Sequence, residues 1–306
     1  MDISVVGVGH SCIDYVGLVN RIPAADERAI IKQLTCQVGG LVATALAALA
    51  RLGVKVGFVG KVGDDALGQM ILKEFTREGI DISRVVVEKG ASSSASLVLT
   101  EEGTGRRTIG SYRAFEDLSE DEMDRDYITS GKFVHVDGRF PKASLLAARW
   151  AREKGLEVTF DCDQISPHVE ETIRFTDYLI ADEAFPADFT GHEDVVEAAT
   201  ALLRLGPKAV VVTLGRKGCV AVTAQGIIRQ PAFEVKAVNT LGAGDVFHGA
   251  FLYGLLQGWG LEDNLRFASL VAAIKCTRLG GWSSLPTLNE VKDFVSEAGI
   301  SFPLLA

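Results

Sequence analysis

The sequence predicts an α/β fold in which helices cover both faces of a mostly parallel sheet. Short β-rich runs alternate with longer helical runs along the chain, which is typical of parallel strands joined by crossover helices. The strand runs are apolar throughout, as expected where helices bury both faces of the sheet. The expected strands are residues 3–9, 54–60, 132–136, 156–161, 177–181 and 209–215, and the expected helices include 41–53, 66–79, 145–155 and 246–258.

Two stretches, 15–37 and 92–112, interrupt this alternation. In SSSASLVLTEEGTGRRTIGSY, period-two alternation and a glycine-containing turn predict hairpin strands outside the main sheet. We expect both stretches to form a lid. The chain has no repeat, no low-complexity tract and no linker rich in Pro, Gly or Ser, so we expect one domain over residues 1–306.

Charge and composition exclude several classes of partner. The net charge of -9 and the pI near 5.2 disfavour nucleic acid and anionic lipid. The longest apolar stretch, Leu41 to Ala50, is too short to span a bilayer, and the N-terminus carries no basic region. The five cysteines are odd in number and never form a CxxC pair, which fits a reducing compartment. We expect a cytoplasmic protein that binds neither nucleic acid nor membrane.

Three common site motifs do not fit. The turn GVGHSCID begins like a dinucleotide fingerprint, but Cys12 occupies the third glycine position. Neither Gly60-Lys61 nor Gly131-Lys132 is followed by the Ser or Thr that a Walker loop requires. The five histidines show no zinc-binding spacing, so we interpret them as ordinary core or surface residues.

The stretch NTLGAGDVFHGAF, residues 239–251, indicates an anion site. Gly242, Ala243 and Gly244 lack bulky side chains, so a ligand can approach their backbone closely. The helix expected after them directs free N–H groups and its positive end toward the same place. Asp245, in the first turn, fits either a helix cap or a general base that accepts a proton from an attacking hydroxyl.

Other glycine-rich turns are expected on the same side of the sheet, because ligands of open α/β sheets bind beyond the carboxyl ends of the strands. VVVTLGRKG ends a buried strand in a turn that fits either phosphate oxygens or a simple hairpin. Gly39 and Gly40 precede an Ala-rich helix that can pack closely, and GKVGDDALG follows at 60–68.

In this order, the motifs resemble those of the ribokinase, or pfkB, family of carbohydrate kinases. That family carries GG before an xAxAxARLG helix, then GxVGxDxxG, then DTxGAGD, which read here GGLVATALAALARLG, GKVGDDALG and NTLGAGD. The match runs from Val5 to about Val291. It implies a ribokinase-like three-layer sandwich with a β-lid and transfer of the ATP γ-phosphoryl group, with Mg²⁺, to a sugar hydroxyl. GGLVATA, GDVFHGA and RFASLVAAIKCTRLGG look most similar to the sulfofructose kinase branch.

The resemblance also implies roles for individual residues. Asp245 would be the catalytic base, with the N–H groups of Gly242, Ala243 and Gly244 forming the anion hole. Family members often dimerise through the lid, so we expect a homodimer. Residues expected on the sugar side are Asp14, Gly39, Gly40, Thr44, Arg28, Arg113, Arg139 and Ser111. Residues expected near ATP are Thr213, Gly215, Gly218, Asp182, Ala272, Cys276 and Gly280.

Three departures from the family pattern bear on ligands. Asn239 stands where an acid helps to bind a monovalent cation in many members, so we do not expect potassium activation. Thr44 replaces the usual Asn of the GG motif. The NxxE motif associated with magnesium reads DEAF, so Asp182 or Glu183 would have to take the place of its Glu, helped by water.

The substrate stays open at this level. If two or more of Arg28, Arg113 and Arg139 converge, an anionic hexose derivative such as 6-deoxy-6-sulfofructose is favoured, because Arg binds sulfonate and phosphate in a forked geometry. If they are solvated surface residues, a neutral ketohexose or pentose is favoured. The alternatives are a nucleoside kinase and a non-catalytic sugar-binding or sensing protein with the same fold.

Overall fold

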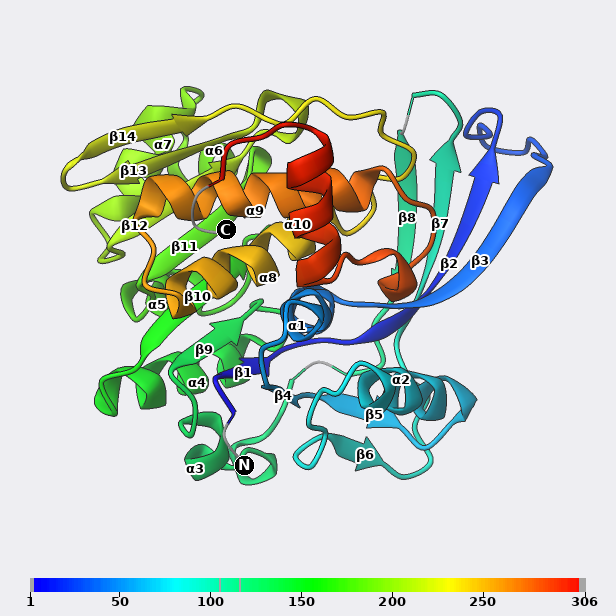
Figure 1. The fold of residues 1–306 in the computed structure, drawn as a ribbon. Helices are drawn as coiled ribbons and strands as arrows, with labels where there is room; N and C mark the ends of the chain where they lie inside the picture. The colour runs from blue at the N-terminus through cyan, green and yellow to red at the C-terminus, as the bar shows by residue number, and fades with distance from the viewer. Residues whose placement is uncertain (1–2, 105, 116, 303–306) are drawn as a thin grey trace.

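An eight-stranded sheet runs through the centre of the computed structural model, which describes residues 3–104, 106–115 and 117–302 (Figure 1). Its strand order is β14-β13-β12-β11-β10-β9-β1-β4. The strands from β12 to β4 are parallel, and β13 and β14 extend the sheet in antiparallel fashion. The prediction of a mostly parallel sheet is therefore confirmed. The strands are β1 Val5–Val8, β4 Val56–Val59, β9 Phe133–Val136, β10 Glu157–Cys162, β11 Tyr178–Asp182, β12 Ala209–Thr213, β13 Cys219–Thr223 and β14 Gly226–Gln230.

Helices cover both faces of this sheet, and each face has its own apolar core. Neighbouring strand residues contribute to opposite cores, as Val5 and Val6 of β1 show. On one face lie α1 Leu41–Arg51, α2 Ala66–Arg77, α8 Ala243–Leu256, α9 Leu261–Cys276 and α10 Leu288–Glu297. On the other lie α3 Arg125–Ile128, α4 Pro141–Glu153, α5 Val169–Arg174, α6 Ala184–Thr190 and α7 Val195–Leu203. In Figure 1, α8 and α9 lie in front of the sheet and α6 and α7 behind it.

The Ala-rich helix α1 packs closely against α8, as its small residues predict. A Cβ added to Gly249 of α8 would come within 2.3 Å of the Ala45 carbonyl oxygen of α1. This close approach fixes α8 against α1. Helix α1 itself begins directly after the paired glycines Gly39 and Gly40. The start of α8 is therefore held beside the GG turn, although about two hundred residues separate them in the sequence.

A second sheet of four strands stands beside the main sheet, at the right of Figure 1. Its order is β3-β2-β7-β8, and β2 pairs in parallel with β7 and antiparallel with β3. Its strands cover both stretches that interrupt the α/β alternation, although residue 105 lies outside the described part. That this sheet closes over a ligand stays a prediction. Its strands are β2 Cys12–Val19, β3 Ile31–Gly39, β7 Ala95–Glu101 and β8 Arg107–Tyr112.

One of the elements not expected from the sequence lies inside a family motif. β5 Lys61–Gly63, inside the GKVGDDALG motif, pairs in parallel with β6 Val86–Glu88 as a separate two-stranded sheet. Within the described residues, no helix is both long and apolar enough to cross a membrane.

Candidate active site

The carboxyl edge of the main sheet carries the polar groups of the site. Asp161 lies near the end of β10, and Asp137 follows β9 directly. Asp182 and Thr213 end β11 and β12 and are paired in register, so the two residues are neighbours across the sheet. Gathering of polar side chains at this edge is typical of ligand sites in open α/β sheets.

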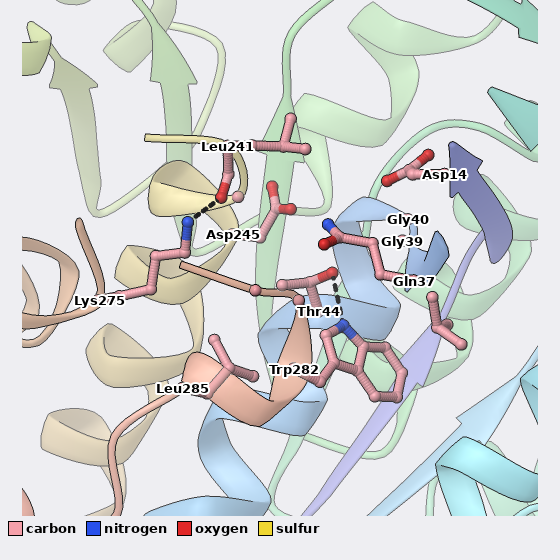
Figure 2. Close-up of a pocket in the computed structure, with 14 residues that line it drawn as sticks. Asp14, Gln37, Gly39, Gly40, Thr44, Leu241, Asp245, Lys275, Trp282 and Leu285 are labelled. Atoms are coloured by element: carbon pink, nitrogen blue, oxygen red, sulfur yellow. Dashed lines mark hydrogen bonds between the residues drawn. The ribbon is translucent and has the colours of Figure 1, made fainter. Parts of the chain in front are cut away.

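A cavity of about 50 Å³ lies between the strands β2 and β3, the starts of α1 and α8, the end of α9 and the loop at residues 280–285. Figure 2 shows Asp245 pointing into it from α8, with Asp14 on the opposite side. Seven predicted site residues line it, namely Asp14, Gly39, Gly40, Thr44, Gly242, Asp245 and Gly280. The other lining residues are Gln37, Val38, Leu241, Lys275, Gly281, Trp282 and Leu285.

The turn before α8 leaves backbone amides free. Gly242 adopts φ 76°, a left-handed conformation that glycine allows, and α8 begins at the next residue. Ala243 is not a free donor, because its N–H donates to the Thr240 carbonyl at 3.2 Å. In the described structure, the N–H groups of Gly242, Gly244 and Asp245 have no backbone acceptor. The predicted anion hole would therefore use the amide of Asp245 in place of that of Ala243.

Asp245 is a half-buried carboxylate at the positive end of α8. Burial raises its pKa well above the usual value, and the carboxylates of Asp161, Asp163 and Asp14 raise it further. A carboxyl group with a raised pKa retains a proton more readily, which suits a group that accepts one from a hydroxyl. One helical turn thus carries both the candidate base and backbone amides without a backbone acceptor.

The lid sheet directs a row of polar side chains across all four strands. Gln37 of β3 is paired with Asp14 of β2, Asp14 with Ser96 of β7, and Ser96 with Ser111 of β8. The Ser96 and Ser111 hydroxyl oxygens lie 3.4 Å apart. Asp14 and Gln37 line the cavity, so this row belongs to the inner face of the lid. It offers hydroxyl, amide and carboxylate groups suited to a sugar.

Gly39 is required where it stands because of Asp14. A Cβ at this position would meet the Asp14 Oδ2 atom at 2.1 Å. Thr44 Oγ1 accepts a hydrogen bond from the Trp282 indole at 3.1 Å, drawn as a dashed line in Figure 2. The GG motif therefore positions both a sugar-side carboxylate and an aromatic wall.

Two of the three candidate arginines converge. Arg113 Nη2 and Arg139 Nη1 both donate to the Gln164 Oε1 atom, at 3.1 and 2.6 Å. Burial and then the neighbouring Arg139 charge lower the pKa of Arg113. Arg139 also forms an ion pair with Asp163, whereas Arg113 has no carboxylate within 4.0 Å in the described chain. Arg28 is different, because it lies exposed in the loop between β2 and β3, away from the cavity lining.

His10 connects the arginine pair to the cavity. Its carbonyl oxygen lies against Gly40, where a Cβ would approach within 2.3 Å. Burial, then Arg139 and Arg113, lower the pKa of His10 to about 3, so the ring is neutral. Its Nε2 atom is buried and has no hydrogen-bond partner in the part of the chain described. Arg113, Arg139 and His10 are not among the residues that line the cavity, so a sugar-side role for the two arginines stays a prediction.

Comparison with known proteins identifies the family. The family profile described as pfkB family carbohydrate kinase matches residues 2–288. The chain belongs to the pfkB family of carbohydrate kinases. A 5-dehydro-2-deoxygluconokinase of Clostridium perfringens is 31% identical, with 96% of this chain and 93% of that protein covered. An ATP-dependent ribose-1-phosphate kinase of Halopiger xanaduensis is 29% identical, with 96% and 99% covered.

The fold of this pfkB kinase is the ribokinase-like fold. An Arabidopsis thaliana ribokinase, solved in complex with ribose and ATP, superposes with a TM-score of 0.84 at 25% identity, covering 96% of this chain and 99% of that one. The predicted three-layer α/β arrangement is therefore confirmed. The relatives described above are named for a sugar acid and a sugar phosphate, and neither is named for sulfofructose.

The predicted nucleotide side of this pfkB kinase follows β11 and β12. TLGRKG forms the hairpin turn between the antiparallel strands β12 and β13, so the hairpin alternative describes its backbone. Within it, a Cβ on Gly218 would meet the Gln230 carbonyl oxygen at 2.0 Å. Gly215 begins the 3₁₀ turn Gly215–Lys217. Thr213 Oγ1 donates to the Ala181 carbonyl at 3.2 Å, and a phosphate role for these residues stays a prediction.

The two candidate magnesium ligands differ. Asp182 Oδ1 accepts a hydrogen bond from the Phe185 N–H at 2.9 Å at the start of α6. Glu183 is exposed and pairs with Lys217 at 3.2 Å. The described residues contain no group of three or more His, Cys, Asp or Glu side chains placed to hold a metal ion.

The predicted adenine-side residues lie on or just after α9. Ala272 and Cys276 belong to its last two turns, and the Cys276 carbonyl accepts the N–H groups of Val238 and Asn239 at 2.8 and 3.1 Å. Gly280 follows at the cavity, with φ 115°. The end of α9 is therefore tied to the segment that leads into the catalytic turn.

Three residues of the site were not found from the sequence. Gln37 lies in a stretch that was predicted only to form part of the lid, and Trp282 follows the last of the family motifs in the sequence. Lys275 carried a detectable signal, because it is a single charge in the otherwise apolar run LVAAIKC of α9. In Figure 2 it points at the carbonyl of Leu241, below Asp245.

Proposed function

We propose that this pfkB carbohydrate kinase transfers the γ-phosphoryl group of ATP to a hydroxyl of an anionic sugar. The observation that carries the proposal is the placement of Asp245 beside three free amides in the cavity that Asp14 of the lid also lines. ATP is supported by relatives and neighbours, since one is named an ATP-dependent kinase and another was solved with ribose and ATP.

In the proposed mechanism, the protein positions the reactants and stabilises charge. The polar row of the lid orients the sugar so that one hydroxyl faces Asp245, which accepts its proton. The free amides of Gly242, Gly244 and Asp245 donate to oxygens of the transferring phosphoryl group, where negative charge accumulates. Burial between the lid and α8 excludes water and strengthens these interactions.

Asp182 is the carboxylate best suited to magnesium. One of its oxygens caps α6, and Glu183 is engaged by Lys217, so the protein offers few free ligands. This fits Mg²⁺, which usually keeps several waters and takes one or two carboxylates together with substrate phosphates. When bound with ATP, the ion supplies positive charge that neutralises the phosphate oxygens.

The converging arginines favour an anionic substrate. Arg113 is exposed and brings a positive charge that Gln164 meets only with a neutral oxygen. A carboxylate, phosphate or sulfonate on the sugar would offset that charge. The polar row of the lid favours a sugar over a nucleoside because it offers hydrogen-bonding groups, whereas Trp282, the aromatic residue that lines the cavity, is only 3% exposed and leaves little surface on which a base would stack.

A sugar panel tests the proposal. ADP release is measured with Mg²⁺-ATP and equal concentrations of 5-dehydro-2-deoxygluconate, ribose 1-phosphate, 6-deoxy-6-sulfofructose, fructose, ribose and adenosine. We expect one of the three anionic sugars to give the highest kcat/KM. A neutral sugar or adenosine at the top would contradict the anionic substrate. No ADP release with any compound, despite ATP binding, would favour the non-catalytic sensor.

We also propose that two chains pair through the outer face of the lid. Leu34 of β3 and Leu97 of β7 lie on the face of the lid sheet opposite to the polar row, and they are 62% and 68% exposed. Exposed apolar side chains grouped on one sheet face are typical of an interface. Sedimentation should give a dimer for the wild type and a monomer for Leu97→Asp; a monomeric wild type would contradict the pairing.

A further inference from the structure

Lys275 is a buried cation with no carboxylate partner. It lies in the last turn of α9 and is 2% exposed. In the described structure no Asp or Glu oxygen lies within the 4.0 Å of an ion pair. Its Nζ atom instead donates to two backbone carbonyls, that of Asn239 at 3.1 Å and that of Leu241. Such burial of a charge is costly, so the arrangement calls for a specific compensation.

The lysine remains charged at neutral pH. Burial lowers its pKa to about 8, while the nearby Asp245 carboxylate acts in the opposite direction. Asn239 contributes no charge of its own because its side chain is a neutral amide, whose oxygen accepts the Leu241 N–H at 3.0 Å. The positive charge directly beneath the catalytic turn is therefore that of Lys275.

The peptide geometry links this ammonium to the anion hole. The Leu241 carbonyl and the Gly242 N–H are the two ends of one planar trans peptide unit, so they point to opposite sides. When Lys275 holds the carbonyl from below, the Gly242 N–H is directed the other way, and Gly242 lines the cavity with Asp245. A carbonyl bound to a cation is also more polarised, which strengthens the N–H at the other end of the unit.

We propose that Lys275 is a positioning residue that acts as a built-in monovalent cation for the anion hole. Its ammonium group orients the peptide units between Asn239 and Gly242 and adds positive charge near the transferring phosphoryl group. Turnover therefore needs no added potassium. This inference rests on the proposed phosphoryl transfer.

Chemical rescue of Lys275→Ala tests the assignment. Removing the side chain leaves two carbonyl oxygens facing an emptied space, and carbonyl oxygens are ligands that K⁺ accepts in place of its hydration water. Turnover of wild type and variant is measured in tetramethylammonium, sodium, potassium and ammonium chloride at equal ionic strength. Lys292→Ala, an exposed lysine of α10, is the matched control.

We expect wild type and Lys292→Ala to turn over equally in all four salts. Lys275→Ala should lose about a hundredfold in kcat in tetramethylammonium, in line with the loss of one preorganised anion-hole donor, and regain at least about tenfold in potassium or ammonium. Activation of the wild type by potassium would overturn the inference, even if the variant does not fold. So would a folded variant whose kcat stays within about threefold of wild type or is not restored by any cation.

The melting temperature gives a second readout that does not depend on turnover. Potassium and ammonium should raise the melting temperature of Lys275→Ala more than tetramethylammonium does, and should leave the wild type unaffected, because only the variant has a vacant site. If no sugar is phosphorylated by the wild type, the proposed function fails, and this salt response still decides whether Lys275 occupies a cation site. An equal response of wild type and variant would overturn the inference.

Discussion

The catalytic turn and the sugar side of this kinase are built in opposite ways. The turn takes the candidate base Asp245 and its three free amides from residues 242–245, so one short segment supplies the groups for the proposed chemistry. The sugar side takes Asp14, Gln37, Ser96 and Ser111 from four strands and its arginines from two further loops. A local motif can stay unchanged while a distributed surface is altered one residue at a time. We infer that the turn sets the reaction and the sugar side sets the substrate.

The largest effect should come from the turn. Asp245→Asn keeps the shape of the side chain but removes the proton acceptor, so we expect kcat to fall about a hundred- to ten-thousandfold with every sugar. The melting temperature should change little, because an ordinary helix cap contributes only about 1 kcal/mol. Steady-state ADP release measures kcat, and thermal melting measures the melting temperature. A variant that keeps its turnover but melts earlier would show that Asp245 is only a cap.

A smaller and selective effect should come from the sugar side. Arg113→Gln removes a charge without leaving an ion-pair partner behind among the residues that the structure describes, which makes it a cleaner change than one at Arg139. We expect kcat/KM to fall about tenfold to a hundredfold for the anionic substrate, mainly through KM, and to change little for a neutral sugar.

Arg229→Gln, an exposed position on β14, is the matched control for that change. It should behave like the wild type with both kinds of sugar. If Arg113→Gln reduces kcat/KM equally for neutral and anionic sugars, the arginine pair supports the fold and does not select the charge of the substrate.

The smallest expected effect is in the pH dependence of the rate. This dependence should reflect only the groups that titrate at the turn. Activity requires deprotonated Asp245, whose pKa is raised, and protonated Lys275, whose pKa is lowered to about 8, with Arg107 and Cys276 as its other charged or titratable neighbours. The rate should therefore fall as the pH drops through the pKa of Asp245 and fall again as the pH rises above about 8.

Melting temperatures distinguish a loss of rate caused by titration from a loss of rate caused by unfolding. Because the pKa of Lys275 is lower in the folded state, the unfolded chain binds more protons above pH 8, and this group makes folding more favourable as the pH rises. Melting temperatures measured from pH 7 to about 9 should thus not fall because of Lys275. A parallel loss of rate and melting temperature would contradict this assignment.

The sequence by itself determined the fold class, the glycine-rich turns and the catalytic aspartate as a candidate. These features depend on local patterns: apolar runs of strand or helix length, and small residues followed at once by an acid at a helix start. The same local rules misplaced one donor of the anion hole, because whether the Ala243 N–H stays free depends on the turn closed by Thr240.

The tertiary structure alone decided which distant residues meet. The pairing of Asp14 with Gln37 and Ser96 depends on strand register, and a slip of one residue would turn those side chains to the outer face. The convergence of Arg113 and Arg139 with His10, and the placement of Lys275 beneath Leu241, join segments that only the packed fold brings together. Sequence patterns report which groups are available, whereas the distances between groups far apart in the chain are fixed by packing.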